Sequence, residues 1–191
     1  MIRQTVVSEL YSQSLRELPG LGTPAASAQL FLKSTSSPRE AANRARRRYT
    51  LYSTMLGFTC GLPGYASAPV TVPMNVTGVL MLQLHMCAVI AIIGGRDPEE
   101  EDVRELSVQC VLNSNSDSES DGWKEFVQRV GVKIGERGFR FASEKAVRWI
   151  GRRTRGLPLI GGIIGGYSDL HSTKTVGHRA ITHFLPEQAK S

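Results

Sequence analysis

The stretch PMNVTGVLMLQLHMCAVIAIIGG, residues 73–95, decides the fold of this chain. It contains no Asp, Glu, Lys or Arg, and it lies inside a longer uncharged stretch that runs from residue 49 to residue 95. Gly94 and Gly95 follow the last apolar residue, and glycine is the residue most often found just past the end of a helix. The stretch therefore predicts an apolar helix over Asn75–Ile93.

A helix this long and apolar has two interpretations. From Pro73 to Ile93 it would reach about 30 Å, enough to cross a bilayer. Gln83 and His85 near its middle argue against insertion, because about 200° separates them around a helix and one face cannot hold both away from lipid. Burial at the centre of a helical bundle explains the same pattern without that cost. We favour the bundle and keep both interpretations open.

The remaining sequence also carries helical signals, and no run alternates with the period of a strand. Besides the apolar helix, we expect helices over residues 2–18, 25–32, 38–56, 98–112 and 123–153, and a terminal helix that ends near residue 184. Residues 61–73, rich in Gly and Pro, predict a loop, and residues 113–122 predict a flexible polar connection. The fold class is therefore all-α, with residues 1–191 forming a single domain around the apolar helix.

The segment LIGGIIGG, residues 159–166, is rich in glycine and follows a break at Pro158. On a helix, small residues four positions apart allow another helix to approach closely. We expect this segment to pack against the apolar helix. A phosphate-binding loop is not expected, because no Gly-Lys-Ser/Thr follows and no strand precedes it.

Charge is unevenly distributed along the chain. The formal net charge is +6, yet residues 96–122 are acidic while residues 1–48 and 123–191 are basic. Two arginine clusters border apolar stretches, which favours contact with an anionic membrane surface. Nucleic acid is not an expected partner, because aromatic residues make up only 7% of the chain and do not alternate with the arginines. The candidate surface residues are Arg44, Arg46, Arg47, Arg48, Arg152, Arg153 and Arg155; a solvated charged face is the alternative.

Few residues suggest bound ligands or catalysis. His171, His178 and His183 lack the spacing of a zinc-binding helix, so we expect no metal, and no motif indicates a cofactor. The candidate ligand-binding residues are Asn75, Gln83, His85 and Asp169. For Asp169 a structural role is favoured, with Lys174 or an arginine as its ion partner.

Cysteine usage indicates the compartment. The three cysteines, Cys60, Cys87 and Cys110, form no CxxC pair, which favours a reducing cytosol, and Cys60 is expected to be an inert packed thiol. The N-terminal residues lack the apolar core of a secretion signal. We expect a cytoplasmic protein, peripheral to the inner membrane where it associates with one.

Several motifs match the EcsC family in the same order: GFTCGLPG at 57–64, VPMN at 72–75, LQLHMCAVIA at 82–91, GGRD at 94–97 and LPLIGGIIGG at 157–166. The chain resembles this family over about residues 38–184. The resemblance implies a mostly helical bacterial protein without an established general activity, named after a protein encoded beside an ABC transporter. Many members carry an acidic residue near the position of Asn75. This chain has an amide there instead, which puts a metal or catalytic role at that position in doubt.

These observations favour a non-enzymatic helical protein that associates with the inner membrane face or with a membrane protein. The alternative is a soluble enzyme or small-ligand-binding protein with a pocket at the Gly-rich breaks, where Gln83, His85 and Asp169 would turn inward. A module that binds another protein cannot be separated from the first interpretation by sequence.

Overall fold

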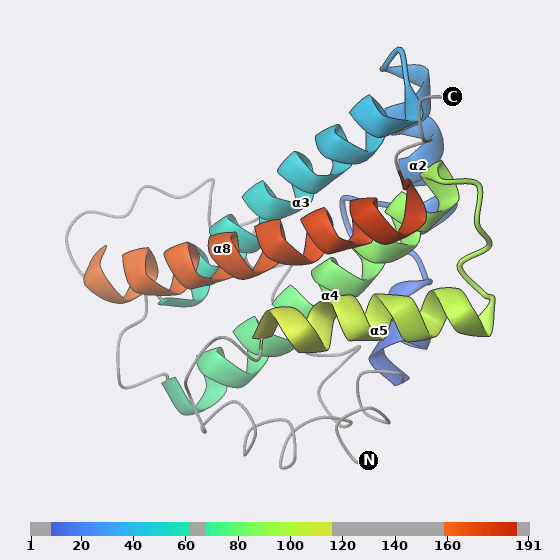
Figure 1. Cartoon of the computed structure of the whole chain (residues 1–191). Coiled ribbons are helices and arrows are strands. Elements are labelled where there is room, and N and C mark those ends of the chain that lie inside the picture. Colours follow the sequence, from blue (N-terminus) through green and yellow to red (C-terminus); the bar gives the residue numbers. More distant parts are fainter. Residues whose placement is uncertain (1–8, 62–67, 116–158, 187–191) are drawn as a thin grey trace.

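The computed structural model describes residues 9–61, 68–115 and 159–186. In these ranges the chain is helical apart from short connections and contains no strand, which confirms the all-α class. The labelled helices are α2 (Pro24–Lys33), α3 (Pro38–Gly61), α4 (Ala68–Ile93), α5 (Glu101–Asn115) and α8 (Leu159–Phe184) (Figure 1).

Helix α4 is the centre of the molecule. It contacts α2, α3, α5 and α8, and every side chain from residue 77 to residue 91 is buried. A helix that is apolar on all sides is stable only when other elements cover it on all sides. Of the two interpretations of the apolar stretch, the structure therefore supports the one in which the helix is buried at the centre of a bundle. Among the described helices, none combines the length and apolar character needed to cross a bilayer.

The start of α4 corrects the predicted loop at residues 61–73. The helix begins at Ala68, so Pro69 lies in its first turn and Pro73 lies inside it. Proline is tolerated in a first turn because the N–H groups there have no intrahelical partner. The end of α4 is as predicted. Gly95 has φ of +78°, and the N–H groups of Arg96 and Gly95 donate to the carbonyls of Ala91 and Ile92, which closes the helix with a Schellman motif.

Helix α3 starts at a serine cap. Ser37 Oγ accepts from the Glu40 N–H at 3.2 Å, and the Glu40 carboxylate accepts from the N–H and hydroxyl of Ser36. These bonds satisfy N–H groups that the first turn leaves unpaired. The predicted end near Leu56 is wrong, because the helix continues to Gly61.

Three further boundaries differ from the expectations, and one is the helix expected from residue 98, which begins at Glu101. The N-terminal helix ends at Ser14 and not at Leu18, and the chain then forms a tight loop closed by a bridge between Leu18 and Gly22. Residues 113–115 of the expected polar connection belong to α5, which continues to Asn115. The helix expected at residues 123–153 lies outside the described residues.

Helices α3 and α8 make the most extensive helix–helix contact in the described part of the chain. They approach closely at Gly177, where an added Cβ would lie 2.6 Å from Cγ of Arg46. Helix α8 also contacts α4, although less extensively than α3. The segment at residues 159–166 is helical, as expected. Its side chains are not among those that the structure describes, so its packing against α4 stays a prediction.

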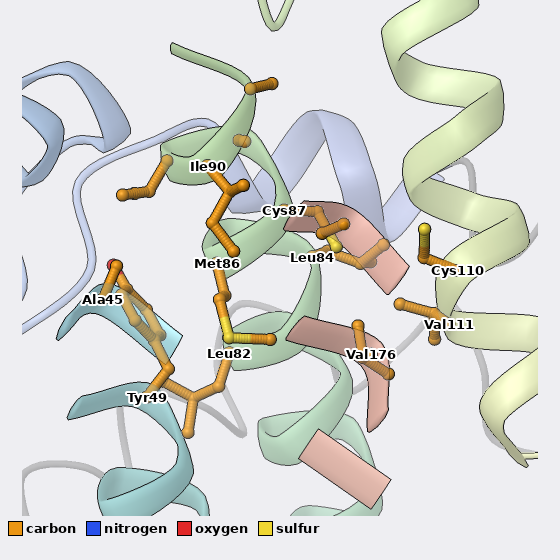
Figure 2. Packing of buried hydrophobic residues seen from close by; sticks show 14 of the residues in the cluster. Ala45, Tyr49, Leu82, Leu84, Met86, Cys87, Ile90, Cys110, Val111 and Val176 are labelled. Carbon is orange, nitrogen blue, oxygen red and sulfur yellow. The ribbon is translucent and has the colours of Figure 1, made fainter. Parts of the chain in front are cut away.

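The helices are arranged in an order that separates α3 from α5. Both contact α4 and α8, and they lie on opposite sides of that pair (Figure 1). Figure 2 shows the core between them, with Tyr49 of α3 directed toward α4 and Val111 of α5 approaching from the other side. The outer surfaces of α3 and α5 therefore face in different directions.

Candidate functional site

The outer surface of α3 changes from basic to apolar along the helix. Six exposed side chains lie within an arc of about 100°, since their spacing follows the 3.6-residue period. These residues, which we call the α3 face, are Arg44, Arg47, Arg48, Leu51, Met55 and Phe58. Leu51 is 60% exposed, Met55 39% and Phe58 37%.

The opposite side of α3 explains why these six residues point outward. Ala41, Ala42, Ala45, Tyr49 and Ser53 are buried against the rest of the bundle. Small residues at the first three of these positions let neighbouring helices approach closely. The helix therefore has its own buried side, and Leu51, Met55 and Phe58 are not needed for the core. A single exposed apolar residue is ordinary, whereas three on one stripe beside three arginines form a patch that calls for a partner.

Contacts within the protein hold two of the arginines at the surface. Arg44 Nη1 donates to the Ser34 carbonyl at 2.7 Å. Arg48 Nη2 donates to the Tyr52 hydroxyl at 3.2 Å, and its guanidinium lies 5.9 Å from the centre of the Phe31 ring. The ion pairs among the described residues join Arg96 and Arg104 to carboxylates, and none involves the α3 face. Among the described residues no carboxylate forms an ion pair with these arginines, and Glu40, one helical turn before Arg44, offsets part of the positive charge at that end of the face.

Arg46 does not belong to this surface, although the sequence placed it there. Its side chain is half-buried, its Nε is buried without a hydrogen-bond partner among the described residues, and its stem lies over Gly177. Helical geometry accounts for the difference, because residue 46 is turned away from residues 44, 47 and 48 toward α8. The other predicted cluster, Arg152, Arg153 and Arg155, lies outside the described residues.

The outer surface of α5 has the opposite charge. Glu101, Asp102 and Glu105 are exposed, and Arg96 pairs with Asp102 and with Glu100 at 3.5 Å. Since α3 and α5 lie on opposite sides of α4 and α8, the described part of the molecule has a basic side and an acidic side. The uneven charge distribution along the sequence is thus also a distribution in space.

Gln83, one of the candidate ligand-binding residues, is fully buried in α4. Its Nε2 donates to Ser172 Oγ at 2.8 Å and to Thr173 Oγ1 at 3.2 Å, so its amide links α4 to α8. Its Oε1 is buried without a hydrogen-bond partner among the described residues. These contacts assign Gln83 a structural role between two helices.

His85 is also fully buried, and it faces a different part of the molecule. Its Nδ1 lies 2.7 Å from the Ser14 carbonyl, and because a carbonyl can only accept, Nδ1 carries the proton. Its ring centre lies 5.7 Å from that of Tyr49, and its Nε2 is buried without a partner in the described chain. Burial lowers the pKa of His85 to about 4, although the bond to Ser14 acts in the opposite direction. The imidazole is therefore neutral at physiological pH.

Among the candidate ligand residues, Gln83 and His85 lie on different sides of α4. Gln83 faces α8 while His85 faces the N-terminal segment, as their angular separation predicts. Asp169 is half-buried, and its backbone carbonyl accepts from Ser53 Oγ at 3.4 Å. Asn75 lies in α4, and its side chain is not among those that the structure describes. Gln83 and His85 thus link α4 to two different neighbouring segments.

Metal binding has no support in the described part of the chain. No group of three or more His, Cys, Asp or Glu side chains there could hold a metal ion. His171, His178 and His183 are exposed on α8.

The exposure of Leu51, Met55 and Phe58 was not predicted from the sequence. Their spacing from Arg44, Arg47 and Arg48 was the available signal, because it continues the same helical stripe. It could not be interpreted from the sequence, since an uncharged run along a helix is just as typical of a buried side.

Comparisons with known proteins give no further assignment. No family model matches the chain, and no curated protein or solved structure is significantly similar to it. The resemblance to the EcsC family therefore stays a prediction.

Proposed function

We propose that this is a non-enzymatic helical protein that docks on the anionic inner face of a cell membrane through the α3 face. The observation that carries the proposal is the continuity of three exposed arginines with three exposed apolar side chains on one side of one helix. Helices that lie at a membrane surface combine these two features, with the apolar side chains among the acyl chains and the cations at the headgroups.

Both halves of the face contribute to the expected affinity. A Lys or Arg near an anionic leaflet contributes roughly 1 kcal/mol. Leu51, Met55 and Phe58 add the hydrophobic gain of leaving water, about 25 cal/mol for each Å² of apolar surface that is buried. Neither half alone is expected to give stable binding, in the same way that a single lipid anchor is marginal.

The acidic side of the molecule supports one orientation. Glu101, Asp102 and Glu105 on α5 are repelled by an anionic surface, whereas Arg44 and Arg47 on α3 are attracted. The resulting torque turns α3 toward the membrane before contact. Because exposed charges are screened over about 8 Å at physiological ionic strength, this orientation depends on salt.

Flotation with vesicles tests the proposal. The full chain is mixed with phosphatidylcholine vesicles that contain either no anionic lipid or 30% phosphatidylglycerol, and the floated fraction is measured at low salt. We expect binding to the anionic vesicles alone. Replacing Arg44, Arg47 and Arg48 together with Gln should weaken binding by roughly 100-fold, the product of three contributions of about 1 kcal/mol.

A charge-matched control separates the face from net charge. Replacing Lys33, Arg39 and Lys174 with Gln removes the same three charges from positions outside the α3 face, and should weaken binding much less. Replacing Leu51, Met55 and Phe58 with Ser should also lower binding while the thermal melt is retained. Equal losses for the two charge variants would contradict a defined docking face, and absence of wild-type binding would point to a membrane protein as the partner.

A further inference from the structure

Cys87 and Cys110 are far apart in sequence and adjacent in the fold. Cys87 lies on α4 and Cys110 on α5, and both are buried, with 0% and 2% of their surface exposed. The two thiols are close enough to affect each other's ionisation. Figure 2 shows the two side chains in the same part of the core, between α4, α5 and the chain of α8 at Val176. The chain thus places two sulfur atoms together, each on a different helix.

A positive charge stands beside this pair. Arg179 of α8 acts electrostatically on Cys110, and its Nη1 is buried without a hydrogen-bond partner among the described residues. A buried guanidinium nitrogen that lacks an acceptor is costly, and a thiolate on Cys110 would supply the missing negative charge. The position of Arg179 therefore favours the ionised form of Cys110.

The two thiols have different tendencies to ionise. The neighbouring Cys87 lowers the pKa of Cys110, burial opposes this effect, and the charge of Arg179 lowers the pKa further. The neighbouring Cys110 and complete burial raise the pKa of Cys87. Cys110 is thus the nucleophile of the pair, and Cys87 keeps its proton until it reacts.

We propose that Cys87 and Cys110 are a redox pair that a hydroperoxide oxidises to a disulfide linking α4 to α5. In the first step the Cys110 thiolate attacks one oxygen of hydrogen peroxide. The S–O bond forms, the O–O bond breaks, and the leaving hydroxide takes a proton to become water. In the second step the Cys87 sulfur attacks the sulfenic sulfur of Cys110. The S–S bond forms, and the S–O bond breaks to release a second water. Two thiols are oxidised and one peroxide is reduced to two waters.

Cys110 lies on α5, an outer helix, and this position gives the oxidant a route to the pair. Gln109, next to Cys110 in sequence, is exposed, so α5 is an outer helix of the bundle. Opening of such a helix exposes its buried side without unfolding the whole molecule. The disulfide would hold α5 to the central helix and block that opening. Reduction by a dithiol would restore it.

Mass spectrometry of the full chain tests the proposal. The folded protein is treated with one equivalent of hydrogen peroxide, its remaining thiols are alkylated, and its peptides are mapped. We expect a cross-linked peptide that joins Cys87 to Cys110 and disappears on reduction. In Cys87→Ala, dimedone should trap a sulfenic acid on Cys110, and Cys60→Ala should leave the cross-link unchanged.

The role of Arg179 gives a quantitative readout. Arg179→Gln should slow cross-linking by about 10-fold or more, because fewer Cys110 thiols are ionised. Arg104→Gln, which removes a charge from α5 itself, is the matched control and should cross-link at the wild-type rate. Thermal melts confirm that each variant is folded, and Arg179→Met, which also removes the charge, serves if the glutamine variant is not. Cross-links that involve mainly Cys60, or equal rates for Arg179→Gln and the control, would overturn the proposal.

Discussion

Single residues of α4 and α8 show how little space and solvation the core provides. His85 is a fully buried imidazole with one hydrogen bond, to the Ser14 carbonyl, and one ring neighbour, Tyr49. Gly177 is a glycine because the stem of Arg46 occupies the place that a Cβ would take. Each position leads to a measurable expectation.

The burial of His85 predicts loss of stability in mild acid. In the folded protein the His85 ring takes up its second proton, which makes it positively charged, only near pH 4. In the unfolded chain it does so near pH 6.5. Between these values the unfolded state holds more protons, so the free energy of unfolding falls as the pH falls, by up to about 3 kcal/mol at pH 4. Urea unfolding followed by circular dichroism between pH 7 and pH 4 measures this.

Two variants separate His85 from the carboxylates that also titrate in this range. His85→Asn keeps a side-chain N–H that can donate to the Ser14 carbonyl, and should flatten the pH dependence. His178→Asn changes an exposed histidine and should keep the wild-type slope. Identical slopes for wild type and His85→Asn would show that His85 does not titrate as its burial implies.

Crowding at Gly177 predicts the effect of its replacement. Gly177→Ala should destabilise the protein by about 1–3 kcal/mol, because the new Cβ meets Arg46 Cγ and the gain in helix propensity is only about 1 kcal/mol. Thermal unfolding measures the change. In the Arg46→Ala background the same substitution should cost less, since Cγ and Cδ of Arg46 are gone and only the flexible end of Met86, at 3.2 Å, still crowds the Cβ. Equal costs in both backgrounds would place the strain elsewhere.

At the scale of helices, the sequence predicts which helices exist better than it predicts where they begin and end. The apolar run identifies α4, and the serine cap and the Gly94–Gly95 pair locate one end each of α3 and α4, because local chemistry determines those ends. Other ends depend on packing. Gly57 costs a helix only about 1 kcal/mol, so the buried side of α3 can carry the helix past it. Ser14 ends its helix where its carbonyl meets His85, a contact between distant segments.

The cap of α3 gives a prediction at this scale. Ser37→Ala should lower the free energy of unfolding by about 1 kcal/mol, because the Glu40 N–H loses its acceptor at the first turn. Ser36→Ala is the matched control. Its main-chain N–H still reaches the Glu40 carboxylate, so the expected loss is smaller. Chemical denaturation compares the two variants, and a larger loss for Ser36→Ala would contradict this account of the cap.

For the molecule as a whole, the arrangement of α3 and α5 turns a charge pattern in the sequence into two sides of opposite charge. The sequence indicates the basic and acidic segments, but only the packing of α8 and α4 determines which side of α3 remains outside. Arg46 and Arg47 illustrate the limit, because they are neighbours in sequence and only Arg47 reaches the surface fully. In the same way, the uncharged run after Arg48 contains both buried Tyr49 and exposed Leu51.

The most direct test of membrane docking measures the polarity around the α3 face with a fluorescent probe. In a background with Cys60, Cys87 and Cys110 replaced by Ala, Met55→Cys on α3 and Gln109→Cys on α5 are each labelled with the fluorophore NBD. With vesicles containing 30% phosphatidylglycerol, emission from position 55 should shift to the blue and increase, because the probe enters an apolar layer. Emission from position 109 should stay unchanged. An unchanged spectrum at position 55 while the protein floats with the vesicles, or a larger shift at position 109, would contradict docking through the α3 face.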